Sequence, residues 1–180
     1  MAKYVAFLRA INIGKRLVKM DRLKKVFEEL KFKNVKTFIN SGNIIFEATT
    51  KDKEQLAGKI EKKLKTSLGF EVLTMIRTEK ELASIVKANP FKDEKLDKDT
   101  RVYIALLYNK PGKEIINILS SLNNKNETFR LKKNVVYCLV HKDEKNSSYF
   151  SITLLEKKLD IPLTIRNQNT INRINAVLES

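Results

Sequence analysis

The chain has 180 residues, 42% hydrophobic and 32% charged, with only 5 Gly and 3 Pro, a composition that excludes disorder and is typical of a globular protein. No apolar run approaches the ~20 residues that a membrane span needs, and a single cysteine excludes an internal disulfide. Lys and Arg total 36 against 21 Asp and Glu, and this net charge of +15 favours polyanions such as RNA, DNA or phosphorylated metabolites.

The first half of the chain has the order strand–helix–strand–strand–helix–strand. Tyr4–Arg9 is apolar on both faces, which predicts a strand at the centre of a sheet. The other predicted elements are a helix with Met20, Leu23, Phe27 and Leu30, strands Val35–Ile39 and Asn43–Glu47 around the turn Asn40–Gly42, a helix with Leu56, Ile60 and Leu64, and a strand Glu71–Ile76. Thr49 and Asp52 form a possible capping box before the second helix.

The second half repeats this order after a connecting segment. Thr78–Glu81 is a capping box that opens a connecting helix, which ends before Pro90. The remaining predicted elements are a strand Arg101–Leu107, a helix opened by Pro111-Gly112, strands Glu127–Leu131 and Val135–Val140, a helix with Phe150, Leu154, Leu155 and Leu159, a strand Leu163–Arg166, and a last helix capped by Thr170. We predict a repeat of pattern only, with no residue-level identity between the halves.

These patterns predict an α+β protein made of two ferredoxin-like (βαββαβ) units in tandem, with a connecting helix and a C-terminal helix. We expect an N-terminal unit at 1–77, a connecting helix and linker at 78–100, and a C-terminal unit with the extra helix at 101–180. In this topology the loop after the first strand and the hairpin between the second and third strands lie at the same end of the sheet. The loop 9–16 should therefore lie beside Asn40–Asn43.

The chain resembles, over nearly its whole length, a bacterial family catalogued as domain of unknown function 1697. The resemblance rests on four motifs in one order: Tyr4–Gly14 followed by Val18-Lys19-Met20, Asn40–Asn43 with Phe46, Asn89-Pro90-Phe91, and Thr164–Thr170. It implies a duplicated α/β fold and no established activity. The chain departs from the usual pattern with Ala10 where the family mostly has Gly, and with Lys15 where a second Gly is common, so we expect a stiffer first loop.

The best candidate site is the predicted junction of this loop and hairpin. It combines cationic side chains, polar side chains and the uncluttered backbone of Gly14 and Gly42, which suits a phosphate or another small anion. The candidate residues are Arg9, Asn12, Lys15, Arg16, Lys19, Ser41 and Asn43. Alternatively, Asn12 and Ser41–Asn43 bond to each other and to the backbone and only fix a tight turn against a loop.

A secondary candidate is the start of the last helix, where Arg166, Asn167 and Thr170 would meet an anion at free backbone N–H groups. The structural alternative, a helix capped by Thr170 with Arg166 in a structural pair, explains these residues better. Cys138 and His141 should point to opposite faces of one strand, so they form neither a nucleophile pair nor a metal site. We expect no metal and no cofactor.

The charge is concentrated near the N-terminus: residues 1–36 carry 11 basic and 3 acidic side chains, which gives +8. The alternative interpretation is compositional, because lysines in a chain rich in Lys, Asn and Ile often form only solvated helix faces. The segment Tyr4–Leu8 is too short for a signal peptide, and with one cysteine we expect a cytoplasmic protein without a membrane partner.

Three functional hypotheses follow. The first is non-catalytic binding of an anionic ligand, nucleic acid or a phosphorylated small molecule, at the basic loop end of the N-terminal unit. The second is a small-molecule enzyme that uses Arg9, Asn12, Ser41 and Asn43 to orient a substrate, although no nucleophile or general base can be named. The third is a protein-interaction module that pairs with a partner or a second copy through exposed sheet edges. The oligomeric state is open between a monomer and a weak dimer. The sequence does not decide whether the protein is an enzyme.

Overall fold

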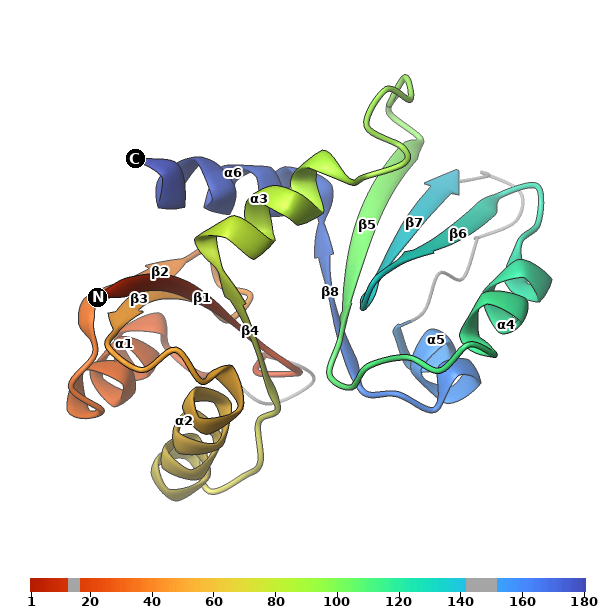
Figure 1. The fold of residues 1–180 in the computed structure, drawn as a ribbon. Helices are drawn as coiled ribbons and strands as arrows, with labels where there is room; N and C mark the ends of the chain where they lie inside the picture. The colour runs from red at the N-terminus through yellow and green to blue at the C-terminus, as the bar shows by residue number, and fades with distance from the viewer. Residues whose placement is uncertain (13–16, 142–151) are drawn as a thin grey trace. The chain divides into compact units, whose positions relative to one another are not determined.

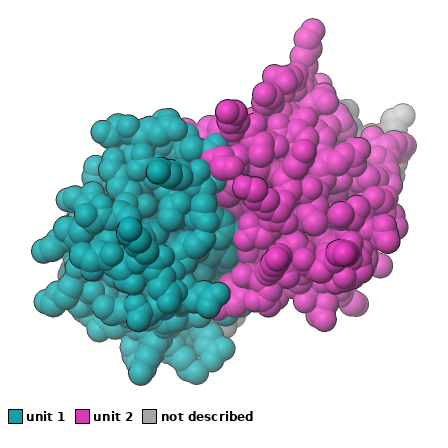
Figure 2. All heavy atoms as spheres, viewed as in Figure 1, with its two compact units in different colours: residues 1–83, 174–180 teal, residues 84–173 magenta. Residues whose placement is uncertain are grey.

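The structure is a computed structural model that describes residues 1–12, 17–141 and 152–180. Within these residues it has a mixed α/β fold with six helices and two four-stranded antiparallel sheets (Figure 1). It divides into two compact units, shown in two colours in Figure 2: unit 1 comprises residues 1–83 and 174–180, and unit 2 comprises residues 84–173. Each unit has its own sheet and its own core.

Unit 1 is built on a sheet with the strand order β2-β3-β1-β4. Its elements are β1 (Ala2–Leu8), α1 (Met20–Glu29), β2 (Lys33–Phe38), β3 (Asn43–Ala48), α2 (Lys53–Leu68) and β4 (Thr74–Thr78). The central position of β1 confirms the prediction from its two apolar faces. Helices α1 and α2 cover one face of the sheet (Figure 1), where Phe27 and Ile60 join Tyr4 and Phe46 in one buried cluster.

Unit 2 has the corresponding strand order β6-β7-β5-β8. Its elements are β5 (Thr100–Leu107), α4 (Ile115–Leu122), β6 (Glu127–Lys132), β7 (Val135–His141), α5 (Ile152–Leu159) and β8 (Leu163–Asn167). Its core joins Leu119 of α4 and Leu155 of α5 to Ala105 and Cys138 of the sheet. The helices α3 (Glu79–Lys87) and α6 (Gln168–Glu179) each contribute residues to both units.

In both sheets the central strand pairs with the last strand in the same register. Tyr4 of β1 pairs with Thr78 of β4, and Tyr103 of β5 pairs with Asn167 of β8. From these tyrosines the central strands read Tyr-Val-Ala-Phe-Leu and Tyr-Ile-Ala-Leu-Leu, and the last strands contain Ile76-Arg77 and Ile165-Arg166 at matching positions. The prediction that no residue-level identity links the halves is therefore wrong. The identities were missed because they are short and lie almost a hundred residues apart.

The element bounds correct several local predictions. Thr170 does not cap the last helix, because α6 begins at Gln168 and the Asn167 side chain accepts the backbone N–H of Asn169 at 2.8 Å. The second helix is capped by Asp52, whose carboxylate accepts the N–H groups of Glu54 and Gln55. Helix α4 begins at Ile115 rather than at Pro111-Gly112, since the chain forms a separate turn over 113–114 before the helix.

The capping box at Thr78 is confirmed in both directions. The N–H of Thr78 donates to Glu81 Oε2 at 2.9 Å, and the N–H of Glu81 donates to Thr78 Oγ1 at 3.1 Å. The division into units differs from the predicted one, because the boundary falls inside α3 and residues 174–180 group with unit 1. The reason is burial: Ile174 and Leu178 are apolar and fully buried, and Lys3 Nζ donates to the carbonyl of Leu178 at 2.8 Å.

Candidate anion-binding site

The loop after β1 and the β2–β3 hairpin lie side by side at one end of the unit 1 sheet. The backbone N–H of Leu8 donates to the carbonyl of Gly42 at 2.8 Å, and Asn12 Nδ2 donates to the carbonyl of Asn40 at 3.0 Å. The predicted adjacency is confirmed for the described part of the loop, up to Asn12, and residues 13–16 lie outside the described residues. The adjacency follows from the topology, because β1 and β2 run in the same direction on either side of β3 and so end at the same edge.

Asn12 holds the loop in place from both sides of its amide. Its Nδ2 reaches the hairpin at Asn40, and its Oδ1 accepts the backbone N–H of Val18 at 2.7 Å. Asn12 thus connects the start of the loop both to the hairpin and to Val18, two residues before α1 begins. These bonds engage the amide in scaffolding, as the structural alternative for Asn12 expects.

Gly42 makes the close approach of the hairpin possible. Its φ is +69°, and a Cβ at this position would lie 2.6 Å from Ile11 Cγ2 and 3.1 Å from Leu8 Cβ. Only glycine combines this backbone conformation with the space available. Ala10 in the facing loop also has a positive φ of 54°, a backbone conformation that glycine adopts more easily than alanine.

Asn43 is fully buried and fixes the hairpin from inside. Its Nδ2 donates to the carbonyl of Phe38 at 3.0 Å and to Ser41 Oγ at 2.8 Å. Its amide is therefore part of the turn, and Ser41 is held against it. The side chain orders the hairpin backbone rather than projecting from the site.

Of the four predicted cationic residues, the structure describes Arg9 and Lys19. Arg9 follows β1 directly, is half-buried and donates its backbone N–H to the carbonyl of Leu73 at 2.9 Å. Lys19 is exposed and takes the N-cap position of α1 without a side-chain cap bond. Gly14, Lys15 and Arg16 lie outside the described residues. The structure thus brings Asn12, Ser41 and Asn43 together at the hairpin. Arg9 lies three residues before Asn12, and Lys19 directly follows Val18, which Asn12 binds.

The secondary candidate residues are largely absorbed by structural contacts. Arg166 is buried, its Nη1 donates to Thr164 Oγ1 at 2.7 Å and to the carbonyl of Ile165 at 2.8 Å, and burial lowers its pKa to about 10. Thr170 lies inside the first turn of α6. A cavity of about 270 Å³ adjoins Asn167 and is lined by both Asp97 and Arg101, whose Nη1 donates to the carbonyls of Asp97 and Thr100. These contacts give Arg166 a structural role, whereas the predicted cap at Thr170 is replaced by the Asn167 side chain.

Sequence reasoning missed a second buried arginine, Arg77 in β4. Its side chain is 7% exposed, its Nη1 donates to the carbonyl of Ile76 at 2.9 Å, and its Nη2 has no hydrogen-bond partner among the described residues. Burial lowers the pKa of Arg77, and the nearby carboxylate of Glu81 partly offsets this. A single arginine inside the otherwise apolar and threonine-containing strand Thr74–Thr78 was the available signal.

The remaining candidates from the sequence are Cys138 and His141, and His141 Nδ1 lies 3.0 Å from Thr100 Oγ1. Cys138 is fully buried in the unit 2 core, and burial raises the pKa of its thiol well above the usual range, with the charge of Glu127 adding to the effect. Across the described residues, no three His, Cys, Asp or Glu side chains gather closely enough to hold a metal ion. In the same part of the chain, no helix combines the length and apolarity that crossing a membrane would require.

The loop and hairpin lie within the region of the chain that a protein family shares. The model of the family described as "Protein of unknown function (DUF1697)" matches residues 1–137. The chain belongs to this family. The match includes all of unit 1 up to its last seven residues, and it ends within β7 of unit 2.

A solved structure gives the second comparison for this DUF1697 protein. It is similar to the structure described as that of the conserved bacterial protein SP0830 from Streptococcus pneumoniae, with a TM-score of 0.81 and 22% sequence identity. The similarity covers 100% of this chain and 99% of the other. At this identity the comparison shows a shared fold. No curated protein matches the sequence.

Proposed function

We propose that this DUF1697 protein binds an anionic ligand, nucleic acid or a phosphorylated small molecule, without catalysis, at the basic loop end of unit 1. One observation carries the proposal: in unit 1 the side chain of Asn12 ties the start of the loop to the hairpin, the side chain of Asn43 orders the hairpin, and unit 2 has no asparagine at either matching position. Asn43 in β3 corresponds to Val135 in β7, and Gly42 corresponds to Asn134. The positions match because Leu8 and Leu107 donate their N–H groups to the carbonyls of Gly42 and Asn134, respectively.

Local charge alone does not separate the two units. The loop end of unit 2 also has exposed lysines, at 110, 113 and 133. What distinguishes unit 1 is a set of side-chain bonds at this end, since Asn12 ties the start of the loop to the hairpin and Asn43 orders the hairpin itself. Backbone held in this way loses less entropy when a ligand orders its contacts. In the proposed site, Arg9, Lys15, Arg16 and Lys19 supply charge and Ser41 a hydroxyl group, while the two amides act as scaffold.

The engagement of these amides favours binding over catalysis. The hydrogen bonds of Asn12 and Asn43 described above go to backbone groups and to Ser41, so neither amide is presented to a substrate. The predicted site residues include no carboxylate, histidine or cysteine that would act as a general base or nucleophile.

We infer further that each unit is ferredoxin-like and that the two form a tandem duplication. The shared strand order, the shared register and the repeated Tyr-x-Ala-x-Leu and Ile-Arg strings support this. A bacterial, cytoplasmic setting is supported by the source of the structurally similar protein and by the single cysteine.

The test compares two triple variants of the full chain that change charge equally. The first carries Lys15→Glu, Arg16→Glu and Lys19→Glu in the unit 1 loop. The control carries Lys110→Glu, Lys113→Glu and Lys133→Glu at the exposed loop end of unit 2. Fluorescence anisotropy with a labelled short RNA and a labelled DNA duplex, at several salt concentrations, gives affinity and salt slope. A thermal-shift panel of phosphorylated metabolites covers small ligands.

We expect the unit 1 variant to bind at least tenfold more weakly, with the salt slope reduced by ~0.7–0.9 for each phosphate that the variant no longer neutralises. The unit 2 control should bind like the parent. Equal losses of affinity in both variants would show that net charge alone is responsible. If the parent binds neither nucleic acid nor any phosphorylated metabolite, the proposal is wrong.

A further inference from the structure

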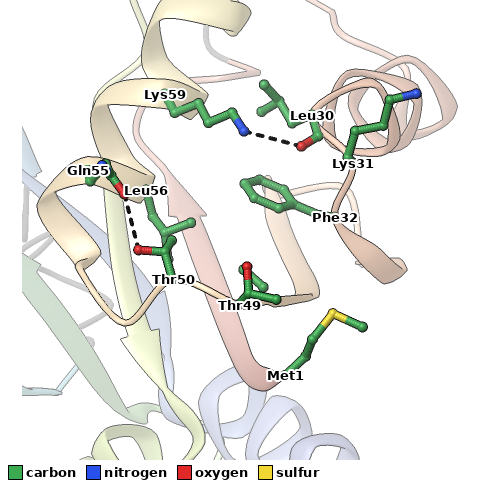
Figure 3. Close-up of a pocket in the computed structure, with 10 residues that line it drawn as sticks. Met1, Leu30, Lys31, Phe32, Thr49, Thr50, Gln55, Leu56 and Lys59 are labelled. Carbon is green, nitrogen blue, oxygen red and sulfur yellow. Dashed lines mark hydrogen bonds between the residues drawn. The ribbon is translucent and has the colours of Figure 1, made fainter.

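A cavity of about 270 Å³ opens at the opposite end of the unit 1 sheet from the loop and hairpin (Figure 3). It is formed where β1 begins, β3 ends at Ala48, and the chain passes from α1 through Phe32 into β2. The first two turns of α2, with Leu56 and Lys59, close it from above. All of its lining residues belong to unit 1.

The floor of the cavity is apolar and rigid. Phe32, Leu56 and Ala48 line it and are 8%, 1% and 5% exposed. The centroid of the Phe32 ring lies 4.6 Å from that of Phe46 and 6.0 Å from that of Phe27. An aromatic cluster therefore supports the floor from below, which keeps it open without rearrangement.

The rim is rich in hydrogen-bond donors and is held in place by the backbone around it. Tyr4 OH donates to the carbonyl of Thr50 at 2.9 Å, and the Asp52 cap fixes the first turn of α2, where Gln55 lies. Thr50 Oγ1 and Gln55 Oε1 are 3.1 Å apart, so the hydroxyl donates and the two N–H groups of the Gln55 amide remain available as donors.

Lys59 supplies the positive charge. Its ammonium lies 5.7 Å from the centre of the Phe32 ring and donates to the carbonyl of Leu30 at 3.4 Å, near the upper limit for a hydrogen bond (Figure 3). An ammonium has three donors, and this arrangement uses one of them weakly. None of the residues that line the cavity is acidic. On the neighbouring helix α1, the carboxylate of Glu29 is held by Lys63 at 2.6 Å.

We propose that this cavity binds a small carboxylic acid with a compact apolar body. The apolar body would lie on Phe32 and Leu56, and the carboxylate would meet the ammonium of Lys59 and the amide of Gln55. Two lysines line the cavity, but the side chain of Lys31 points away from it (Figure 3), so only the ammonium of Lys59 lies beside the apolar floor. One ammonium there matches a single negative charge better than a phosphate dianion. The volume lies below the ~300–1,000 Å³ of drug-sized pockets, so the ligand has on the order of ten non-hydrogen atoms.

Phenylacetate is a suitable probe, because it joins an aromatic body to one carboxylate. Titration of the full chain, followed by the methyl and amide NMR signals of unit 1, should show saturable shifts at Leu56 and Gln55 at millimolar concentrations. Phenylacetamide, which lacks the charge, and acetate, which lacks the apolar body, should each bind at least fivefold more weakly. The Lys15, Arg16 and Lys19 triple variant should bind phenylacetate like the parent, which separates this site from the proposed function.

Two variants and a control locate the site. Lys59→Met removes the charge but keeps the aliphatic stem, and Thr49→Phe fills the cavity from an exposed position. Each should weaken phenylacetate binding at least fivefold, whereas Lys62→Met, an exposed position on the same helix, should not change it. If phenylacetate does not bind the parent at up to about 20 mM, or binds both variants like the parent, the proposal is wrong.

Discussion

At the same corner of its sheet, unit 1 buries the amide of Asn43, and unit 2 buries the side chain of Val135. The strands around these residues share their register, yet the connections differ. Residues 39–42 join β2 to β3 around two positive φ values, whereas only Lys133 and Asn134 join β6 to β7. The sheets are therefore equivalent scaffolds, and the difference between the units lies in the loops that they carry.

The same sheet topology thus accommodates connections of different length between the second and third strands of each unit. A longer hairpin has more backbone groups to satisfy, and in unit 1 the side chains of Asn12 and Asn43 satisfy several of them. A short turn followed by Val135 needs no such partners. The polar residues in unit 1 are thus first a structural requirement of the longer hairpin. The paired charge variants test whether the cations carried by this end of unit 1 bind a ligand.

The largest expected effect is a loss of stability when one methyl group is added to the unit 1 hairpin. Gly42→Ala places a Cβ 2.6 Å from Ile11 Cγ2 at a φ of +69°, so we expect a loss of ~2–4 kcal/mol in the free energy of unfolding. Asn134→Ala, at the matching position of unit 2, should cost less than ~1 kcal/mol. Urea unfolding followed by circular dichroism measures both.

Gly58→Ala provides a control for the substitution itself. A Cβ at Gly58 would meet no atom within 4 Å, and the residue lies inside α2. This variant should be more stable than the parent by ~0.5–1 kcal/mol, because alanine favours the helix. A Gly42→Ala protein as stable as the parent would mean that the loop and hairpin are not in close contact.

The fold could be predicted largely because apolar spacing reports burial directly. β1, apolar on both faces, had to be central, and the capping box at Thr78 had to begin a helix. The use of side chains could not be predicted in the same way. An asparagine beside a glycine has the same sequence pattern whether its amide meets a ligand or, as for Asn43, a carbonyl in its own turn. The cavity beside Lys59 has no sequence motif, because residues from four separate segments form it.

A second comparison concerns the two buried arginines at matching register, Arg77 opposite Val5 and Arg166 opposite Ile104. Arg166 donates to the hydroxyl of Thr164 and to a carbonyl, whereas Arg77 Nη2 has no partner among the described residues. Arg166→Met should therefore cost ~1–3 kcal/mol of unfolding free energy, since it removes satisfied bonds from a buried site.

Arg77→Met should stay within ~1 kcal/mol of the parent, because it removes a buried charge whose bonding is incomplete. Glu81 keeps its bonds to Lys53 and to the N–H of Thr78 in this variant. Urea midpoints of the two variants, measured side by side, test the ordering. A larger loss for Arg77→Met than for Arg166→Met would show that Nη2 has an important partner in solution.

A last, pH-dependent effect concerns Tyr137, whose matching residue in unit 1 is the apolar Ile45. Tyr137 OH donates to the carbonyl of Ile85 at 2.8 Å, and burial raises the pKa of Tyr137 from 10.0 to about 12. Near neutral pH, Tyr137→Phe should cost ~1 kcal/mol for the lost hydrogen bond. Between pH 10 and 12 the unfolded tyrosine ionises while the folded one stays neutral, so the parent loses stability that the variant keeps. The gap between their urea midpoints should narrow from pH 9 to pH 11. A gap that stays constant or widens would mean that this hydroxyl ionises as readily in the folded protein as in the unfolded chain.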